Sequence, residues 1–195
     1  MPLNEPILLR FVLLAGLLAH KLLWEVLKRR RAPRPPSTRG PLGPLTIATK
    51  AVKMLVLLFL VVQTLFLDVL PITAERGALR GAGLVLFLTG LVMAVTGRLQ
   101  LGRNWVDLED YTVLPGQALV ARGLYRYVRH PIYAGDIILL IGLQLALNSW
   151  LVLGVLPVVI VVVRQARAEE NLLLRTLPGY REYCGRTKRF IPLVV

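Results

Sequence analysis

Five long apolar blocks, separated by charged segments, constrain this chain more than any other feature. Hydrophobic residues make up 55% of its 195 residues, and they are gathered over residues 6–27, 51–70, 81–101, 132–147 and 150–163. A helix needs about 20 apolar residues to cross a bilayer, where its backbone must satisfy its own hydrogen bonds. The sequence therefore predicts an all-α polytopic membrane protein with five transmembrane helices.

Lysine and arginine are distributed unevenly between the two sides of these spans. Residues 28–53, 98–129 and 164–195 together carry twenty of them, whereas residues 68–80 and 148–150 carry two. Cytosolic loops are enriched in Lys and Arg, so we expect the N-terminus outside and the C-terminal tail in the cytosol. We expect a bacterial or archaeal cytoplasmic membrane. The net charge of +13 lies in these loops, where it suits anionic lipid headgroups, and we expect no nucleic-acid partner.

The first three blocks carry signals of anchoring and packing. No small-residue cleavage site follows the first block, so we expect an uncleaved anchor. The third block contains Gly81, Gly83, Gly90 and Gly97, and such small residues let helices approach closely in lipid. Residues 102–121 are too polar to span the bilayer. We expect them to form an ordered interfacial loop.

The most informative stretch is RGLYRYVRHPIYAG, residues 122–135, which places arginines, tyrosines and a histidine directly before an apolar block. A second charged stretch, RQARAEENLL, follows the last block. If the last two blocks form an antiparallel hairpin that turns at Asn148-Ser149, His130 and Glu169 both lie about 28 to 30 Å from the turn. The sequence therefore predicts that a histidine, arginines and two carboxylates converge at one membrane surface.

Each stretch alone could simply anchor a helix at the interface, and their matched height is what favours a site. A metal site is not expected, because the chain has two histidines that lie far apart in sequence. Its single cysteine, Cys184, excludes an intramolecular disulfide. No spacing of nucleophile and base and no glycine-rich phosphate loop is present. The remaining interpretation is a pocket for a zwitterionic or cationic cofactor, with carboxylate and arginine as its partners.

The stretches ALVARGLYRYVRHPIYAG, AEENLLL and PGYREYCGRTKRFIP occur in this order over residues 117–192. Together they resemble the C-terminal signature of the isoprenylcysteine carboxyl methyltransferase family, which is similar also to phospholipid methyltransferases. These are integral-membrane enzymes that use S-adenosylmethionine. The resemblance implies one methyltransferase domain over residues 1–195, with a three-helix membrane part at 1–101 and a cofactor-binding catalytic part at 102–195. The acceptor would be a lipophilic small molecule or a lipidated group, for example a prenylcysteine-like carboxylate.

The resemblance also assigns roles to individual residues. Those implied to contact S-adenosylmethionine are Gln117, Ala118, Leu119, Val120, Tyr125, His130, Pro131, Ile132, Tyr133 and Glu170. In the family an arginine one turn before that glutamate contacts the acceptor, but position 166 is alanine here. The neighbours are Arg164 and Arg167, of which we favour Arg167 as the catalytic residue.

Two other functions are weighed against this one. A membrane reductase of the sterol-reductase type would bind NADPH, but the Glu169-Glu170 pair stands where a basic phosphate-binding helix would be expected. A non-catalytic membrane scaffold would bind neither cofactor. Binding of S-adenosylhomocysteine or of the reduced dinucleotide separates the three possibilities. The sequence indicates neither the oligomeric state nor the identity of the acceptor.

Overall fold

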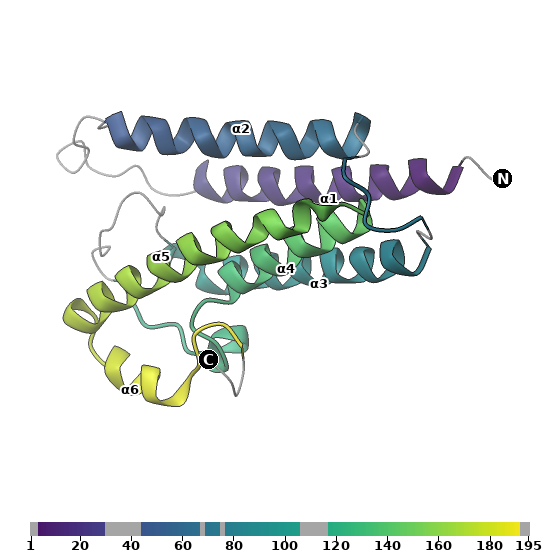
Figure 1. The fold of residues 1–195 in the computed structure, drawn as a ribbon. Coiled ribbons are helices and arrows are strands. Elements are labelled where there is room, and N and C mark those ends of the chain that lie inside the picture. The colour runs from purple at the N-terminus through teal and green to yellow at the C-terminus, as the bar shows by residue number, and fades with distance from the viewer. Residues whose placement is uncertain (1–3, 30–43, 67–68, 75–76, 106–116, 192–195) are drawn as a thin grey trace. The chain divides into compact units, whose positions relative to one another are not determined.

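The computed structural model describes residues 4–29, 44–66, 69–74, 77–105 and 117–191 (Figure 1). Over these ranges the chain is helical, and its extended pairings are two isolated β-bridges without a strand. The chain divides into two compact units, Met1–Val69 and Leu70–Val195. The predicted all-α class is therefore confirmed for the described part of the chain.

The first unit contains two antiparallel helices, α1 (Asn4–Arg29) and α2 (Pro44–Phe66), which lie side by side (Figure 1). A polar contact joins them, because the Arg10 guanidinium donates to the backbone carbonyl of Thr64 at 3.0 Å. Along α2 large apolar side chains such as Leu55 and Leu58 are exposed. Exposed apolar side chains are expected on a helix whose solvent is lipid.

The second unit contains α3 (Gly77–Leu101), α4 (Pro131–Ala146), α5 (Val155–Thr176) and α6 (Tyr180–Arg186). Short 3₁₀ helices lie between them: η2 (Gly102–Asn104), η3 (Gly123–Arg126) and η4 (Trp150–Gly154). Within the described ranges, four helical segments are long and apolar enough to cross a membrane: Ile7–Arg29, Ile47–Phe66, Gly77–Leu101 and Trp150–Thr176. The helix α4 is apolar but shorter, so the predicted fifth span is not established.

The helix α4 packs mainly against α3 along a seam of small residues. A Cβ atom added to Gly90 would lie 2.3 Å from the backbone nitrogen of Leu139, and one added to Gly142 would lie 2.2 Å from that of Phe87. The backbones therefore touch where no side chain intervenes, as small residues permit in membrane helices. We call Gly83 and Gly90 of α3 with Gly135 and Gly142 of α4 the glycine seam. The packing role predicted for Gly83 and Gly90 is confirmed, whereas a Cβ at Gly81 would meet nothing within 4 Å.

The chain turns at Asn148-Ser149, between the end of α4 and the start of η4, and the predicted hairpin of two membrane spans remains a prediction. Asn148 is buried with a positive φ of 54°, and its side chain exchanges two hydrogen bonds with the backbone of Thr73. The Ser149 hydroxyl accepts a hydrogen bond from the backbone of Leu151 at the start of η4. These bonds hold the segment before α3 against the turn, so one end of the second unit is tied together. The predicted loop at 102–121 lies partly outside the described residues.

Candidate functional site

At the other end of the second unit, the motif that precedes α4 folds into η3 and a helix start. Pro131 occupies the first turn of α4, where its missing N–H costs no hydrogen bond, and His130 is the N-cap. Gly123 opens η3 with a positive φ of 59°, which a side chain would disfavour. The chain can therefore turn sharply before α4, and this places Tyr125 and His130 in the interior.

The predicted meeting of His130 with the two glutamates is confirmed. The His130 Nε2 atom lies 3.0 Å from Oε1 of Glu170, and the Tyr133 hydroxyl donates to Glu169 at 3.0 Å. The His130 and Tyr133 rings stack with centroids 5.3 Å apart. The first turn of α4 and the far part of α5 thus contribute to one polar site.

The two glutamates differ in their surroundings. The Glu170 side chain is 7% exposed and is bound by Arg129 at 2.8 Å, by Arg189 at 2.7 Å and by His130. We call these four residues the Glu170 cluster. The Glu169 side chain is 41% exposed and is oriented by Tyr133. One carboxylate is therefore enclosed by basic side chains, whereas its neighbour is available to a ligand.

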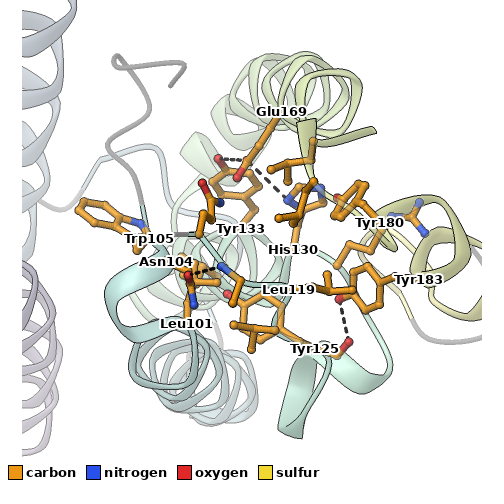
Figure 2. A pocket seen from close by; sticks show the side chains of 17 residues that line it. Leu101, Asn104, Trp105, Leu119, Tyr125, His130, Tyr133, Glu169, Tyr180 and Tyr183 are labelled. Carbon is orange, nitrogen blue, oxygen red and sulfur yellow. Dashed lines mark hydrogen bonds and ion pairs between the residues drawn. The ribbon is translucent and has the colours of Figure 1, made fainter. Parts of the chain in front are cut away.

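Beside the two glutamates lies a pocket of about 680 Å³, its open mouth included (Figure 2). Aromatic and apolar side chains dominate its wall, and a few polar groups converge on it. The lining residues are Leu101, Asn104, Trp105, Gln117, Ala118, Leu119, Val120, Tyr125, Arg129, His130, Ile132, Tyr133, Glu169, Leu173, Leu177, Tyr180 and Tyr183. A pocket whose wall combines apolar and aromatic side chains with a few converging polar groups is typical of a small-molecule site.

Eight of the ten residues predicted to contact the cofactor line this pocket. The other two, Pro131 and Glu170, are buried and are not part of its wall. Pro131 packs toward Gly97, whose added Cβ would lie 3.3 Å from the proline ring. Glu170 reaches the pocket through His130, which contacts both.

The structure does not bring Arg167 into the pocket. Arg167 and Arg164 are exposed on α5 and do not line the wall, whereas Ala166 is completely buried. Inward positions on this helix include Ala166 and Glu170, which are four residues apart and therefore share a face. The catalytic role of Arg167 remains a prediction.

Sequence reasoning missed the support that the end of α3 and the following η2 give to the pocket. The Asn104 side chain accepts a hydrogen bond from the backbone of Ala118 at 2.9 Å, and Gln100 accepts one from Leu124 at 2.8 Å. The Arg98 guanidinium lies 4.3 Å from the centre of the Trp105 ring, so it supports another part of the wall. Polar side chains at the end of an apolar span were the available signal.

The tyrosines Tyr180 and Tyr183 of α6 were also missed. Figure 2 shows them on the side of the pocket opposite Trp105 and Asn104. Burial raises the pKa of the Tyr183 phenol to about 12, although Arg129 opposes this shift. Burial is also the main cause of the raised pKa values of Tyr125 and Tyr180. All three phenols are therefore neutral at physiological pH and can donate hydrogen bonds, but they are not bases.

Comparison with known proteins gives a family match and a structural match. The model of the phospholipid methyltransferase family matches residues 79–178, about half of the chain. The eukaryotic intramembrane Ras methyltransferase ICMT, an isoprenylcysteine carboxyl methyltransferase, has a similar fold with a TM-score of 0.64 and 21% sequence identity. That match covers 99% of this chain and 70% of the ICMT chain. The resemblance expected from the sequence motifs is therefore confirmed.

Two curated relatives are metal-resistance proteins. The nickel-cobalt-cadmium resistance protein NccN of Alcaligenes xylosoxydans xylosoxydans is 30% identical over 107 residues, which are 54% of this chain and 47% of NccN. The cobalt-zinc-cadmium resistance protein CzcN of Cupriavidus metallidurans is 31% identical over 111 residues, 56% of this chain and 49% of CzcN. The chain thus spans about half the length of these relatives. Within the described ranges, no three His, Cys, Asp or Glu residues gather where they could hold a metal ion.

Proposed function

The chain belongs to the phospholipid methyltransferase family, and we propose that it transfers a methyl group from S-adenosylmethionine to a lipophilic or amphiphilic acceptor in the membrane. One observation carries this proposal. The pocket wall unites the residues Gln117–Val120, Tyr125, His130, Ile132 and Tyr133 with Glu169 of α5. Glu169 lies 36 residues beyond Tyr133 in the sequence, so its meeting with the earlier motifs at one pocket supports a shared ligand.

The chemistry of the pocket suits this cofactor. S-adenosylmethionine has an adenine ring, an amino-acid part and a sulfonium cation, and when bound it supplies an electrophilic methyl group. The aromatic rings of Tyr125, Tyr133 and Trp105 can stack on a base or face a cation. The Glu169 carboxylate can receive a cationic group, and the Arg129 guanidinium can face a carboxylate.

We propose different roles for the two glutamates. Glu169 lines the pocket with a partly exposed side chain, so it can meet a positive charge of the cofactor directly. Glu170 was expected to be that acidic partner, but three basic side chains already surround it. Glu170 would therefore act on the cofactor indirectly, by fixing His130 and Arg129 in the wall.

The proposed methyl transfer requires little general acid-base catalysis from the protein. Attack on a sulfonium methyl group is an in-line displacement with a good leaving group, so orientation and removal of water from the nucleophile matter most. If the acceptor is a carboxylate, it is already ionised at neutral pH and requires no base. The tyrosines of the wall are neutral and do not act as bases, which is consistent with a reaction that requires none. Arg167 is our candidate to hold such a carboxylate from the exposed side of α5.

The protein is an integral membrane protein, and we propose a specific orientation for it. With α4 as a fifth crossing beside the four longer helices, the twenty-to-two distribution of Lys and Arg puts the N-terminus outside and the pocket on the cytosolic side of a bacterial or archaeal membrane. A reporter fused after Val195 should be active in the cytosol, and one inserted at Gly77 should be outside. Two reporters on the same side would contradict this orientation.

Transfer to an endogenous acceptor tests the proposed activity. Membranes that contain the protein are incubated with S-adenosylmethionine labelled in its methyl group, and the lipid and protein fractions are then separated. We expect label in an amphiphilic product that membranes without the protein do not form. A variant with Leu119→Trp, which fills the pocket, provides the control because it should lose the product. Label that is independent of the pocket variant would refute the proposal.

A further inference from the structure

The segment that follows α6 lies against the start of α4. The backbone N–H groups of Arg129 and His130 donate to the carbonyls of Lys188 and Arg189 at 2.8 and 3.1 Å, and Lys188 donates back to Tyr127 at 3.1 Å. These bonds surround the parallel β-bridge between Val128 and Lys188. We call residues 187–191 the tail segment. It is docked beside the motif that builds the pocket.

Arg189 fastens the tail segment to the interior. Its guanidinium contacts both oxygens of Glu170, with Nη2 at 2.7 Å from Oε2 and Nε at 3.1 Å from each oxygen. A two-oxygen contact of this kind is stronger and more directional than a single hydrogen bond. Arg129 donates from the other side to Glu170 and also to the backbone carbonyls of Cys184 and Thr187. One buried carboxylate thus joins the start of α4, the helix α5 and the tail segment.

The tail segment continues directly from α6, which contributes to the pocket wall. Tyr180 and Tyr183 of this short helix form one wall of the pocket, and the Tyr183 hydroxyl donates to the backbone carbonyl of Tyr125 at 2.7 Å. At its start α6 follows the turn at Gly179, and at its end it continues into the tail segment. At this end the Arg189 contact acts together with the bonds that Arg129 donates to the carbonyls of Cys184 and Thr187.

We propose that Arg189 is a positioning residue of the cofactor site: by pairing with Glu170 it docks the tail segment and so holds the tyrosine wall of α6 over the pocket. This inference rests on the proposed function, because it assumes that the pocket binds S-adenosylmethionine. Docking and cofactor binding are then coupled in both directions. If loss of Arg189 leaves about one molecule in ten docked, the apparent affinity for the cofactor falls about tenfold.

The test compares three variants of the full-length protein in detergent. Arg189→Gln removes the pairing charge, and Arg189→Lys keeps the charge but not the two-oxygen contact. Arg186→Gln is the matched control, because it removes the same charge from an exposed side chain of α6 that pairs with Glu182. For each variant, titration with S-adenosylhomocysteine gives the affinity. Hydrogen exchange over residues 180–189, compared with α3, gives the docking of the tail without any ligand.

We expect Arg189→Gln to weaken S-adenosylhomocysteine binding about tenfold and to accelerate exchange in α6 while α3 stays protected. Arg189→Lys should recover part of both effects, and Arg186→Gln should match the unchanged protein. The Michaelis constant for S-adenosylmethionine should rise in Arg189→Gln, whereas turnover at saturating cofactor should recover, because the cofactor itself restores docking.

Three results would overturn the inference. The first is unchanged exchange in α6 of Arg189→Gln, and the second is accelerated exchange throughout α3, which would show a general loss of stability. The third is a loss of turnover that saturating cofactor does not restore. If the unchanged protein fails to bind S-adenosylhomocysteine, the proposed function fails instead, whereas the exchange measurement still decides whether Arg189 docks the tail.

Discussion

The glycine seam and the Glu170 cluster hold the same helix, α4, in two different ways. Along the seam the backbones of α3 and α4 touch where side chains are absent. At the cluster, basic side chains from two segments, the start of α4 and the tail segment, share the buried carboxylate of Glu170 on α5. In lipid, apolar helices gain little from hiding apolar surface, so close packing must hold them together. A buried charge is tolerated where several partners compensate it.

The two regions therefore stabilise the position of α4 through different interactions. Packing at the seam depends on close backbone contact, so a larger side chain there would clash. The cluster depends on ion pairs, so the loss of one partner would leave a buried charge uncompensated. The seam gives α4 a fixed position, and the cluster uses the polar end of that fixed helix to build the pocket wall. Substitutions in the seam should therefore reduce the yield of folded protein, whereas substitutions in the cluster should mainly reduce the affinity for the cofactor.

The largest effect is expected from a bulky residue in the seam. Gly90→Leu would force side-chain atoms into the backbone of Leu139, because even a Cβ would lie 2.3 Å from its nitrogen. We expect a loss of more than about 3 kcal/mol and little folded protein, measured as the monodisperse yield in detergent and the melting temperature. Gly81→Leu is the matched control, because its Cβ would meet nothing within 4 Å. Equal yields of the two variants would contradict the packing described for the seam.

The next effect is expected from the cluster. Glu170→Gln removes the negative charge that Arg129, His130 and Arg189 share. Removing one partner of a buried ion pair costs about 3 to 5 kcal/mol of stability. We expect a folded but less stable protein whose affinity for S-adenosylhomocysteine falls about ten- to a hundredfold. Calorimetry and a melting curve measure both quantities.

Glu182→Gln serves as the control for the cluster, because Glu182 is exposed and pairs with Arg186 one turn away. It should change neither quantity. Unchanged affinity in a folded Glu170→Gln variant would remove Glu170 from the function of the site. A melting temperature as low as that of Gly90→Leu would instead erase the distinction between the two regions.

The smallest effect on the structure is expected at the exposed face of α5. Arg167→Ala should lower turnover on the order of tenfold and leave S-adenosylhomocysteine affinity unchanged, because Arg167 lies outside the pocket wall. Arg164→Ala tests the competing candidate in the same assay. Should only Arg164→Ala reduce turnover, the assignment is reversed. If neither variant matters, the acceptor is not held by an arginine of this helix.

The sequence predicted the parts of the site that follow from regular helices. Because the helical rise is constant, the distance of His130 and Glu169 from the turn could be calculated before the structure was known. The α3 side of the seam, Gly83 and Gly90, could be predicted because glycines recur along the third apolar block, whereas its α4 side, Gly135 and Gly142, was not predicted. The motif residues Gln117–Val120 entered through family resemblance, and their place in the pocket wall agrees with it.

Other parts of the site could not be predicted because they depend on irregular chain segments. The pairing of Arg189 with Glu170 requires the chain to turn at Gly179 and return beside Val128, and no periodic pattern specifies such a path. The rotation of α5 about its own axis was also undetermined. One residue corresponds to about 100° on a helix, so Ala166 faces inward while Arg167 is exposed.

The central claim is that the pocket beside Glu169 binds S-adenosylmethionine. Calorimetric titration of the purified protein with S-adenosylhomocysteine, and separately with NADPH, tests this claim most directly. We predict saturable binding of S-adenosylhomocysteine, lost in Leu119→Trp, and no heat from the dinucleotide. Binding of NADPH in its place would indicate a reductase, and binding of neither ligand by the folded protein would contradict the proposed activity altogether.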